Sequence, residues 1–154
     1  MKYLLSILLL ITYVSPSNTL TGRVVKVADG DTITILTDGN RQVRIRLLDI
    51  DAPEKGQDFS EKSRRYLADL VAGKTVTVEW STKDRYGRIL GTVYADNINV
   101  NEEMVKAGLA WKYRYSRNIR IAQFESIAKQ QKLNIFSLPN PINPYYYRQS
   151  LRTR

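Results

Sequence analysis

Three β-rich runs near the start of the chain, separated by two tight turns, constrain the fold more than any other feature. The runs cover residues 20–28, 32–36 and 41–51, and the last alternates apolar and polar side chains with the period of two that suits a half-buried strand. The first turn is Asp29-Gly30-Asp31, where we expect Gly30 to adopt a positive φ, and the second spans residues 37–40. This pattern predicts a three-stranded meander in which Asp31 begins the second strand.

The third run ends in acidic residues and a proline. Its alternation predicts an unbroken strand that ends at Asp51. Pro53 has no N–H to donate and restricts the residue before it to extended conformations, so Glu54 falls on the loop that follows. Asp31 and Asp51 then both lie at strand ends, where they can converge around a cation. The alternative is a strand that runs out into a polar turn whose acids are merely solvated.

The rest of the chain adds two strands and three helices. Residues 60–72 have apolar positions at helical spacing, with Ser60 or Asp58 as the expected N-cap. The other elements are predicted at residues 74–80 and 89–95 for the strands, and at residues 99–108 and 120–132 for the helices. One domain is expected over residues 18–137, because no long linker interrupts them. Residues 138–154 are rich in proline, tyrosine and arginine, and we expect an extended basic tail there.

The residue types that are missing narrow the chemistry. The chain has no histidine and no cysteine, which excludes a thiol nucleophile, a catalytic pair built on histidine and the usual zinc sites. Any metal must be held by oxygen atoms, which favours Ca²⁺ or Mg²⁺, and any general base must be a carboxylate, a lysine or a tyrosine. The formal charge of +9 indicates a polyanionic partner, with nucleic acid as the leading candidate and an acidic membrane surface or acidic protein as alternatives.

Residues 1–17 have the composition of a secretory signal peptide. A basic start at Lys2 is followed by an apolar run over residues 4–14 and by small residues before the expected cleavage after Ser17. The apolar run is short for a membrane span, which makes a retained anchor the lesser alternative. We expect an exported protein, periplasmic or secreted, without stable membrane association. A monomer is expected, because no large unexplained apolar stripe is present.

Two later segments combine positive charge with aromatic rings. Arg85, Tyr86 and Arg88 surround a turn glycine, which suits contact with a phosphate or, alternatively, a solvated basic turn. Residues 109–117 interleave aromatic and basic side chains, a mixture that suits single-stranded nucleic acid. About half of these rings are expected to belong to the core instead.

Five segments together resemble the staphylococcal nuclease (thermonuclease) family in order and spacing. They are DGDT at 29–32, RLLDIDAPE at 46–54, DRYGR at 84–88, NEEMV at 101–105 with GLA at 108–110, and KLNIF at 132–136. The resemblance covers about residues 20–137. It implies an α+β fold, a five-stranded oligonucleotide-binding (OB) β-barrel with three helices, which agrees with the elements predicted from the residues.

The resemblance also implies a cation site. Asp31 and Asp51 match the carboxylate ligands of Ca²⁺, and the main-chain carbonyl of Ala52 matches the third protein ligand. The family usually has threonine at the position of Ala52. Because that ligand is a backbone atom, we expect the change to be tolerated, although any help from the hydroxyl group is lost.

The catalytic and substrate-binding positions follow in the same way. Glu54 matches the residue proposed as general base for the attacking water, while orienting the water or holding the loop are its alternative roles. Arg46 and Arg88 match the two arginines that grip the scissile phosphate. The positions that resemble contacts to the rest of the substrate are Arg85, Tyr86, Tyr113 and Tyr115.

The implied activity is Ca²⁺-dependent, sugar-nonspecific endonuclease activity that hydrolyses phosphodiester bonds of DNA and RNA. A barrel that has lost catalysis but still binds nucleic acid is one alternative, because a fold alone does not imply a function. A structural or adhesive basic surface protein is another, but it leaves the acidic and arginine positions unexplained.

Overall fold

The computed structural model describes residues 17–153, so the predicted leader, apart from Ser17, lies outside the described residues. The strands are β1 (Asn18–Asp29), β2 (Thr32–Thr37), β3 (Arg41–Leu47), β4 (Ile50–Asp51), β5 (Thr75–Lys83), β6 (Ile89–Ala95), β7 (Ile98–Asn99) and β8 (Trp111–Lys112). The helices are α1 (Ser60–Val71), α2 (Val100–Lys106), α3 (Ile119–Gln130), the 3₁₀ turn η1 (Asn134–Ser137) and α4 (Pro144–Arg152). Among these residues, no helix has the length and apolar character needed to span a membrane.

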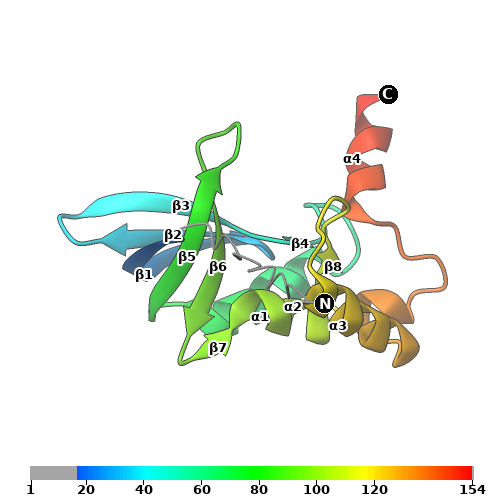
Figure 1. The fold of residues 1–154 in the computed structure, drawn as a ribbon. Helices are drawn as coiled ribbons and strands as arrows, with labels where there is room; N and C mark the ends of the chain where they lie inside the picture. Colours follow the sequence, from blue (N-terminus) through cyan, green and yellow to red (C-terminus); the bar gives the residue numbers. More distant parts are fainter. Residues whose placement is uncertain (1–16, 154) are drawn as a thin grey trace, which may run out of the picture.

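The five long strands close into a barrel (Figure 1). Their order is β3-β2-β1-β5-β6 with antiparallel neighbours, and a parallel pairing of β3 with β6 closes the circle, with Ile45 opposite Ile89 and Leu47 opposite Gly91. The two-residue strands β4 and β8 pair separately beside the barrel. The predicted α+β fold with a five-stranded OB barrel is confirmed.

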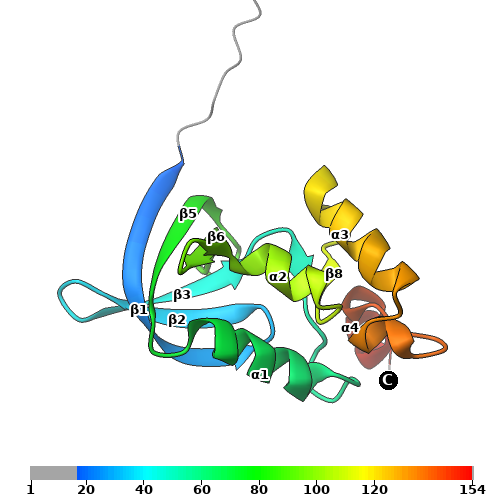
Figure 2. The same cartoon turned by 90° about the horizontal axis from the view of Figure 1, so that it is seen from below.

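Alternating residues of the strands fill the barrel, as the period of two predicts. Val76 and Val78 of β5 are buried together with Ile33 and Ile35 of β2. Figure 2 shows α1 and α2 lying across the barrel, with α3 farther out. Leu67 of α1 belongs to the same core, so the helices and the barrel form one packed unit.

The third predicted strand is broken before it reaches the acidic residues. β3 ends at Leu47 and β4 begins at Ile50, with Asp49 between them at a φ of 66°. The Nη1 atom of Arg46 donates 2.7 Å hydrogen bonds to the carbonyls of both Leu47 and Ile50, which stabilises this turn. The expectation of one unbroken strand over 41–51 was therefore wrong, and Asp51 reaches the site from a separate short strand.

Two local expectations around the first turn and the first helix were also wrong. Gly30 does not have a positive φ; a Cβ atom there would lie 1.9 Å from Ser63 Oγ and 2.8 Å from the Cβ of Ala52, so close packing is what requires glycine. The N-cap of α1 is Phe59, at a φ of 64° and without a side-chain cap, instead of Ser60 or Asp58. Gly30 is therefore required because the turn packs tightly against Ser63 of α1, and not because of its backbone conformation.

The C-terminal segment corrects the expected number of helices from three to four. Residues 144–152 form α4 instead of an extended chain. The side chain of Asn143 accepts the N–H of Tyr145 at 3.0 Å, and Pro144 occupies the first turn, where its missing N–H costs nothing. Asn143 and Pro144 together form a helix-start signal.

Candidate active site

Two buried carboxylates lie at one edge of the barrel. Asp31 immediately precedes β2 and Asp51 ends β4, and only 6% and 1% of their surfaces are exposed. The Asp31 carboxylate accepts the N–H of Ala52 at 2.7 Å, and its backbone carbonyl accepts the N–H of Leu47 at 2.8 Å. These bonds fix the first turn of the chain against the strand break.

Arg46 joins the two carboxylates. Its Nη2 atom lies 3.1 Å from Asp31 Oδ2 and 3.0 Å from Asp51 Oδ1, while Nη1 holds the two backbone carbonyls of the turn. One guanidinium therefore bridges both acids and offsets part of their charge. Such a charged group at hydrogen-bonding distance is needed, because two neighbouring buried carboxylates would otherwise repel each other.

The pKa values of Asp29 and Asp51 at this edge of the barrel are raised, which indicates that their ionised forms need a positive charge nearby. Burial, reinforced by the neighbouring Asp31, raises the pKa of Asp29 to about 7. Burial also raises the pKa of Asp51, although hydrogen bonds and charge from Arg148 and Arg46 oppose that rise. The acids are thus placed where a cation would be favourable.

Glu54 lies on the loop after Pro53 and is more accessible than the two aspartates, with 40% of its side chain exposed. Its backbone N–H donates to Gln57 Oε1 at 2.8 Å, which fixes the loop. Its Oε1 atom accepts a hydrogen bond from Arg148 Nη1 at 2.6 Å. An accessible, ionisable oxygen thus faces the same space as the buried acids.

The β5–β6 turn carries the second group of cations. Asp84 accepts hydrogen bonds from the N–H groups of Tyr86 and Arg88 at 2.9 and 3.0 Å, and its Oδ2 atom lies 2.7 Å from Arg88 Nε. Partial burial of Asp84 opposes ionisation, but the hydrogen bonds from Arg88 outweigh it and lower the pKa of Asp84. Arg85 Nη2 donates to the Tyr86 hydroxyl at 2.7 Å. Asp84 therefore orients the guanidinium of Arg88.

The two predicted tyrosines are held by a loop that depends on Asp49. The backbone carbonyl of Asp49 accepts the N–H of Tyr113 at 2.8 Å, and its carboxylate accepts bonds from Ser116 Oγ at 2.7 Å and from Asn118 Nδ2 at 3.1 Å. The rings of Tyr113 and Tyr115 meet edge to face at 5.6 Å between centroids. Asp49 thus supports this loop from the turn after β3.

These elements surround one groove with a volume of about 660 Å³. It contains every side chain that the sequence assigned to the cation, to catalysis or to the substrate. Those residues are Asp31, Arg46, Asp51, Glu54, Arg85, Tyr86, Arg88, Tyr113 and Tyr115. Ala52, whose role was assigned to its backbone, is buried beside Asp31 and does not line the groove.

Sequence reasoning missed one wall of the groove. Tyr145, Arg148 and Arg152 of α4 also line it. Arg148 Nη2 lies 2.8 Å from Asp51 Oδ2, and hydrogen bonds to Asp51 and then to Glu54 raise the pKa of Arg148. The Asn143-Pro144 helix start was a signal for α4 itself, but the contact with residues almost a hundred positions earlier had no local signal.

The donor atoms at this edge are suited to a hard cation. Within residues 17–153 no group of three or more acidic side chains already forms a metal-binding cluster. The arrangement of Asp31 and Asp51 around one guanidinium nitrogen nevertheless shows that both acids face a position that requires positive charge. Their carboxylate oxygens are the type of ligand that Ca²⁺ or Mg²⁺ accepts.

Comparison with known proteins identifies the family. The sequence profile described as "Staphylococcal nuclease homologue" matches residues 44–138. The chain belongs to the staphylococcal nuclease family. It is 50% identical over 129 residues to an uncharacterized endonuclease of Escherichia coli, covering 82% of this chain and 84% of that one. It is also 45% identical over 130 residues to an uncharacterized endonuclease of Haemophilus influenzae (84% and 73%), and 42% identical over 142 residues to a micrococcal nuclease of Shigella flexneri (84% and 80%).

These similarities confirm the predicted family and the predicted enzyme class, a nuclease. The matched region begins within β3 and includes the break before β4, the Arg88 turn and the loop with both tyrosines. α4 lies beyond its end at residue 138.

Proposed function

We propose that this nuclease hydrolyses phosphodiester bonds of both DNA and RNA in a Ca²⁺-dependent reaction. The observation that supports this most strongly is the single groove in which Asp31, Asp51 and Glu54 face Arg46 and Arg88. Carboxylates for a cation, an accessible carboxylate for water and guanidinium groups for a phosphate are the parts that phosphodiester hydrolysis requires.

In the proposed mechanism, Glu54 accepts the proton of the attacking water. It suits this role because its side chain is accessible and lies on a loop fixed by Gln57. Arg46 and Arg88 donate hydrogen bonds to the phosphate oxygens, on which negative charge grows as the water oxygen bonds to phosphorus. The P–O bond to one sugar then breaks, and the leaving oxygen takes a proton from solvent. Removal of one such donor typically costs about 10²- to 10³-fold in rate. Asp84 keeps Arg88 pointed at the groove and leaves other N–H groups of that guanidinium for the phosphate.

Asp31, Asp51 and the Ala52 carbonyl would hold the cation, with water and phosphate oxygens completing its shell. When bound, Ca²⁺ supplies positive charge that polarises the phosphate. Because Arg46 Nη2 bonds to both aspartates, we expect Arg46 to exchange these partners for phosphate oxygens when the cation and the substrate bind.

Activity on both DNA and RNA is supported by the kind of contacts that the groove offers. Guanidinium groups bind phosphates, which carry no sequence information, and tyrosine rings stack on any base. Tyr86 and Tyr115 are exposed by 67% and 63%, so their rings are accessible to unstacked bases. We therefore expect a preference for flexible or single-stranded regions.

The decisive variant for the mechanism is Glu54→Gln. It keeps the shape of the side chain but removes the base, so we expect turnover of single-stranded DNA to fall by about 100-fold or more, with little change in its binding. Glu61→Gln, on the exposed face of α1, is the matched control. Unchanged turnover in Glu54→Gln would remove Glu54 from the mechanism.

Asp31→Ala tests the proposed cation site. Calorimetric titration with Ca²⁺ should show loss of binding, because one of only two carboxylate ligands is gone. Retained tight binding would contradict the ligand assignment.

A further inference from the structure

The C-terminal helix α4 is built with one side toward the groove. Tyr145, Arg148 and Arg152 are spaced by three and four residues, which places them on the same helix face. All three line the groove, opposite the β5–β6 turn. In Figure 1 that turn rises above the barrel, and α4 rises separately at the right, beyond β8. The groove thus has one basic wall from the nuclease barrel and another from a segment outside the family match.

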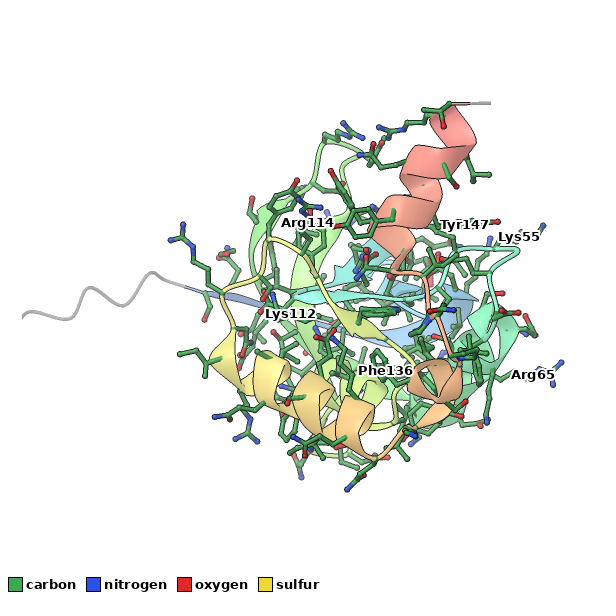
Figure 3. All side chains as sticks on the ribbon, turned by 90° about the vertical axis from the view of Figure 1, so that its right-hand side faces the viewer. Lys55, Arg65, Lys112, Arg114, Phe136 and Tyr147 are labelled. Atoms are coloured by element: carbon green, nitrogen blue, oxygen red, sulfur yellow. The ribbon has the colours of Figure 1, made fainter. Side chains whose placement is uncertain are left out.

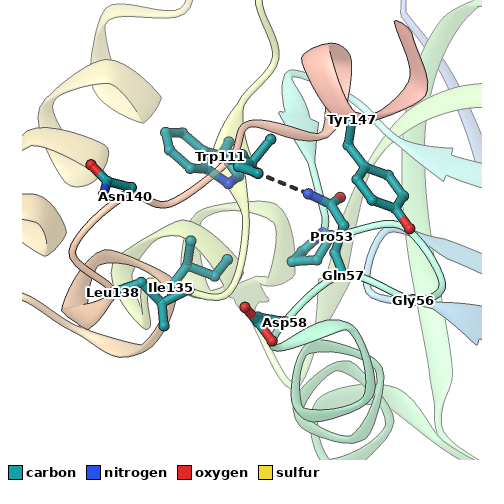
Figure 4. Close-up of a pocket in the computed structure, with 10 residues that line it drawn as sticks. Pro53, Gly56, Gln57, Asp58, Trp111, Ile135, Leu138, Asn140 and Tyr147 are labelled. Atoms are coloured by element: carbon teal, nitrogen blue, oxygen red, sulfur yellow. Dashed lines mark hydrogen bonds between the residues drawn. The ribbon is translucent and has the colours of Figure 1, made fainter. Parts of the chain in front are cut away.

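Contacts other than Arg148 hold α4 in this position. Gln57 Nε2 donates to the Ile142 carbonyl at 3.0 Å, across a pocket of about 180 Å³ shown in Figure 4. On the helix itself, the Tyr147 hydroxyl packs against Gly56 so closely that a Cβ there would lie 3.0 Å from it. The start of α4 is therefore anchored to the loop that carries Glu54.

A second anchor connects α4 to the tyrosine loop. The guanidinium of Arg114 lies 4.4 Å from the ring centroid of Tyr145, and its Nη1 atom donates to the Tyr146 hydroxyl at 3.1 Å. The Tyr115 ring meets Tyr145 edge to face at 6.3 Å. Figure 3 shows Arg114 on its loop beside α4, with Tyr147 on the other side of the helix. Both anchors leave the guanidinium of Arg148 directed into the groove.

Among residues 17–153, the hydrogen bonds of the Arg148 side chain go to the acids that the proposed function assigns to the cation and to the attacking water. Its Nη1 atom bonds to Glu54 at 2.6 Å and to Asp51 at 3.1 Å, and Nη2 bonds to Asp51 at 2.8 Å. A cation held by Asp51 would neutralise the charge that holds this guanidinium. The released Arg148 guanidinium would then lie in the same groove as Arg85 and Arg88, where it can bind a phosphate through two parallel N–H groups.

We propose that α4 is the second wall of the nucleic-acid groove, and that Arg148 exchanges Asp51 and Glu54 for a phosphate of a single strand when a divalent cation binds. Arg152, one turn farther along and exposed, extends the same wall. The inference rests on the proposed function for the cation site and names a substrate contact outside the barrel. Cation binding and strand binding are thereby coupled through one side chain.

Two binding measurements test this. In calorimetry with Ca²⁺ alone, Arg148→Ala should bind the cation about tenfold more tightly, because the competing guanidinium is gone. With Ca²⁺ present, its affinity for a phosphorothioate oligothymidylate should fall about tenfold, and the slope of log affinity against log salt should shrink by about 0.7, the value for one phosphate contact on a single strand. Arg148→Lys should retain most of the salt slope, since it keeps the charge.

Arg65→Ala is the matched control, because it removes an exposed arginine on α1, far from α4 (Figure 3). Arg152→Ala is a second test variant that leaves the bonds to Asp51 and Glu54 in place, and it should also reduce the salt slope. If both Arg148→Ala and Arg152→Ala bind the oligonucleotide as the control does, α4 is not a wall of the groove. Failure of the proposed function is a separate result: the wild-type chain would not cleave, whatever the behaviour of these variants.

Discussion

Asn101 offers a quantitative test of how the site is held together. Its side chain is 3% exposed and links three backbone groups: Oδ1 accepts the N–H of Val93 at 3.0 Å, and Nδ2 donates to the carbonyls of Leu48 at 2.9 Å and Gly91 at 3.1 Å. It thereby ties α2 and β6 to the turn that precedes Asp51.

The cost of Asn101→Ala follows from which of these groups lose a partner. The Gly91 carbonyl keeps its bond from the Leu48 N–H at 2.8 Å, so the Val93 N–H and the Leu48 carbonyl are the two groups affected. At about 1–3 kcal/mol for each buried unpaired group, and with the Leu48 carbonyl only partly buried, unfolding free energy should fall by about 2–4 kcal/mol. That is a large part of the 5–15 kcal/mol that is usual for a folded domain.

Urea denaturation in the presence of a chelator measures this effect without any contribution from a bound cation. The midpoint should fall by about 1–2 M for an ordinary denaturant slope. Asn140→Ala, at an exposed position after η1, should change stability by less than about 0.5 kcal/mol. A loss below 1 kcal/mol for Asn101→Ala would refute the claim that these three bonds hold the turn.

Other predictions concern single contacts. Ser63→Ala removes a 2.7 Å hydrogen bond from a fully buried hydroxyl to the Leu109 carbonyl. Urea denaturation should show a free energy of unfolding lower by about 1–3 kcal/mol, whereas Ser81→Ala, at an exposed position, should leave it unchanged. Gly30→Ala should lower stability by about 1–3 kcal/mol or more through its clash with Ser63, and wild-type stability would contradict the packing account of that glycine. Asp84→Ala should lower kcat/KM on single-stranded DNA by about 10- to 100-fold because Arg88 loses its support, with exposed Asp38→Ala as the control.

The barrel and the acidic edge were predictable because their signals are local. Alternation of apolar residues located the five long strands, and β6 begins and ends where the pattern predicted, at Ile89 and Ala95. The segments DGDT at 29–32 and RLLDIDAPE at 46–54, which contain Asp31, Asp51 and Glu54, can be recognised in the sequence alone.

The broken strand was not predictable from that spacing. Leu48 and Asp49 continue an acceptable β pattern, but β4 pairs with β8, and the side chain of Asp49 bonds to Ser116 and Asn118. Those partners lie more than sixty residues away in the chain, so alternation alone could not reveal that the strand stops at Leu47.

The same reason explains why Arg148 was missed. The helix start at Asn143-Pro144 is a local signal, but its docking depends on Arg114 and on the loop with Gln57. A basic, proline-rich segment has the composition of a solvated tail until these partners are known. The part of the site that the sequence did not predict is therefore the part that depends on contacts between residues far apart in the chain.

The most direct test of the central claim is cleavage by the purified chain from residue 18 onward. Single-stranded DNA and RNA of the same sequence are each incubated with Ca²⁺, with Mg²⁺ and with a chelator, and the products are followed over time. We predict that both are cut with Ca²⁺ and that neither is cut with the chelator. Salt-sensitive binding of both without cleavage in any condition would contradict the account and leave a nucleic-acid-binding barrel without catalysis.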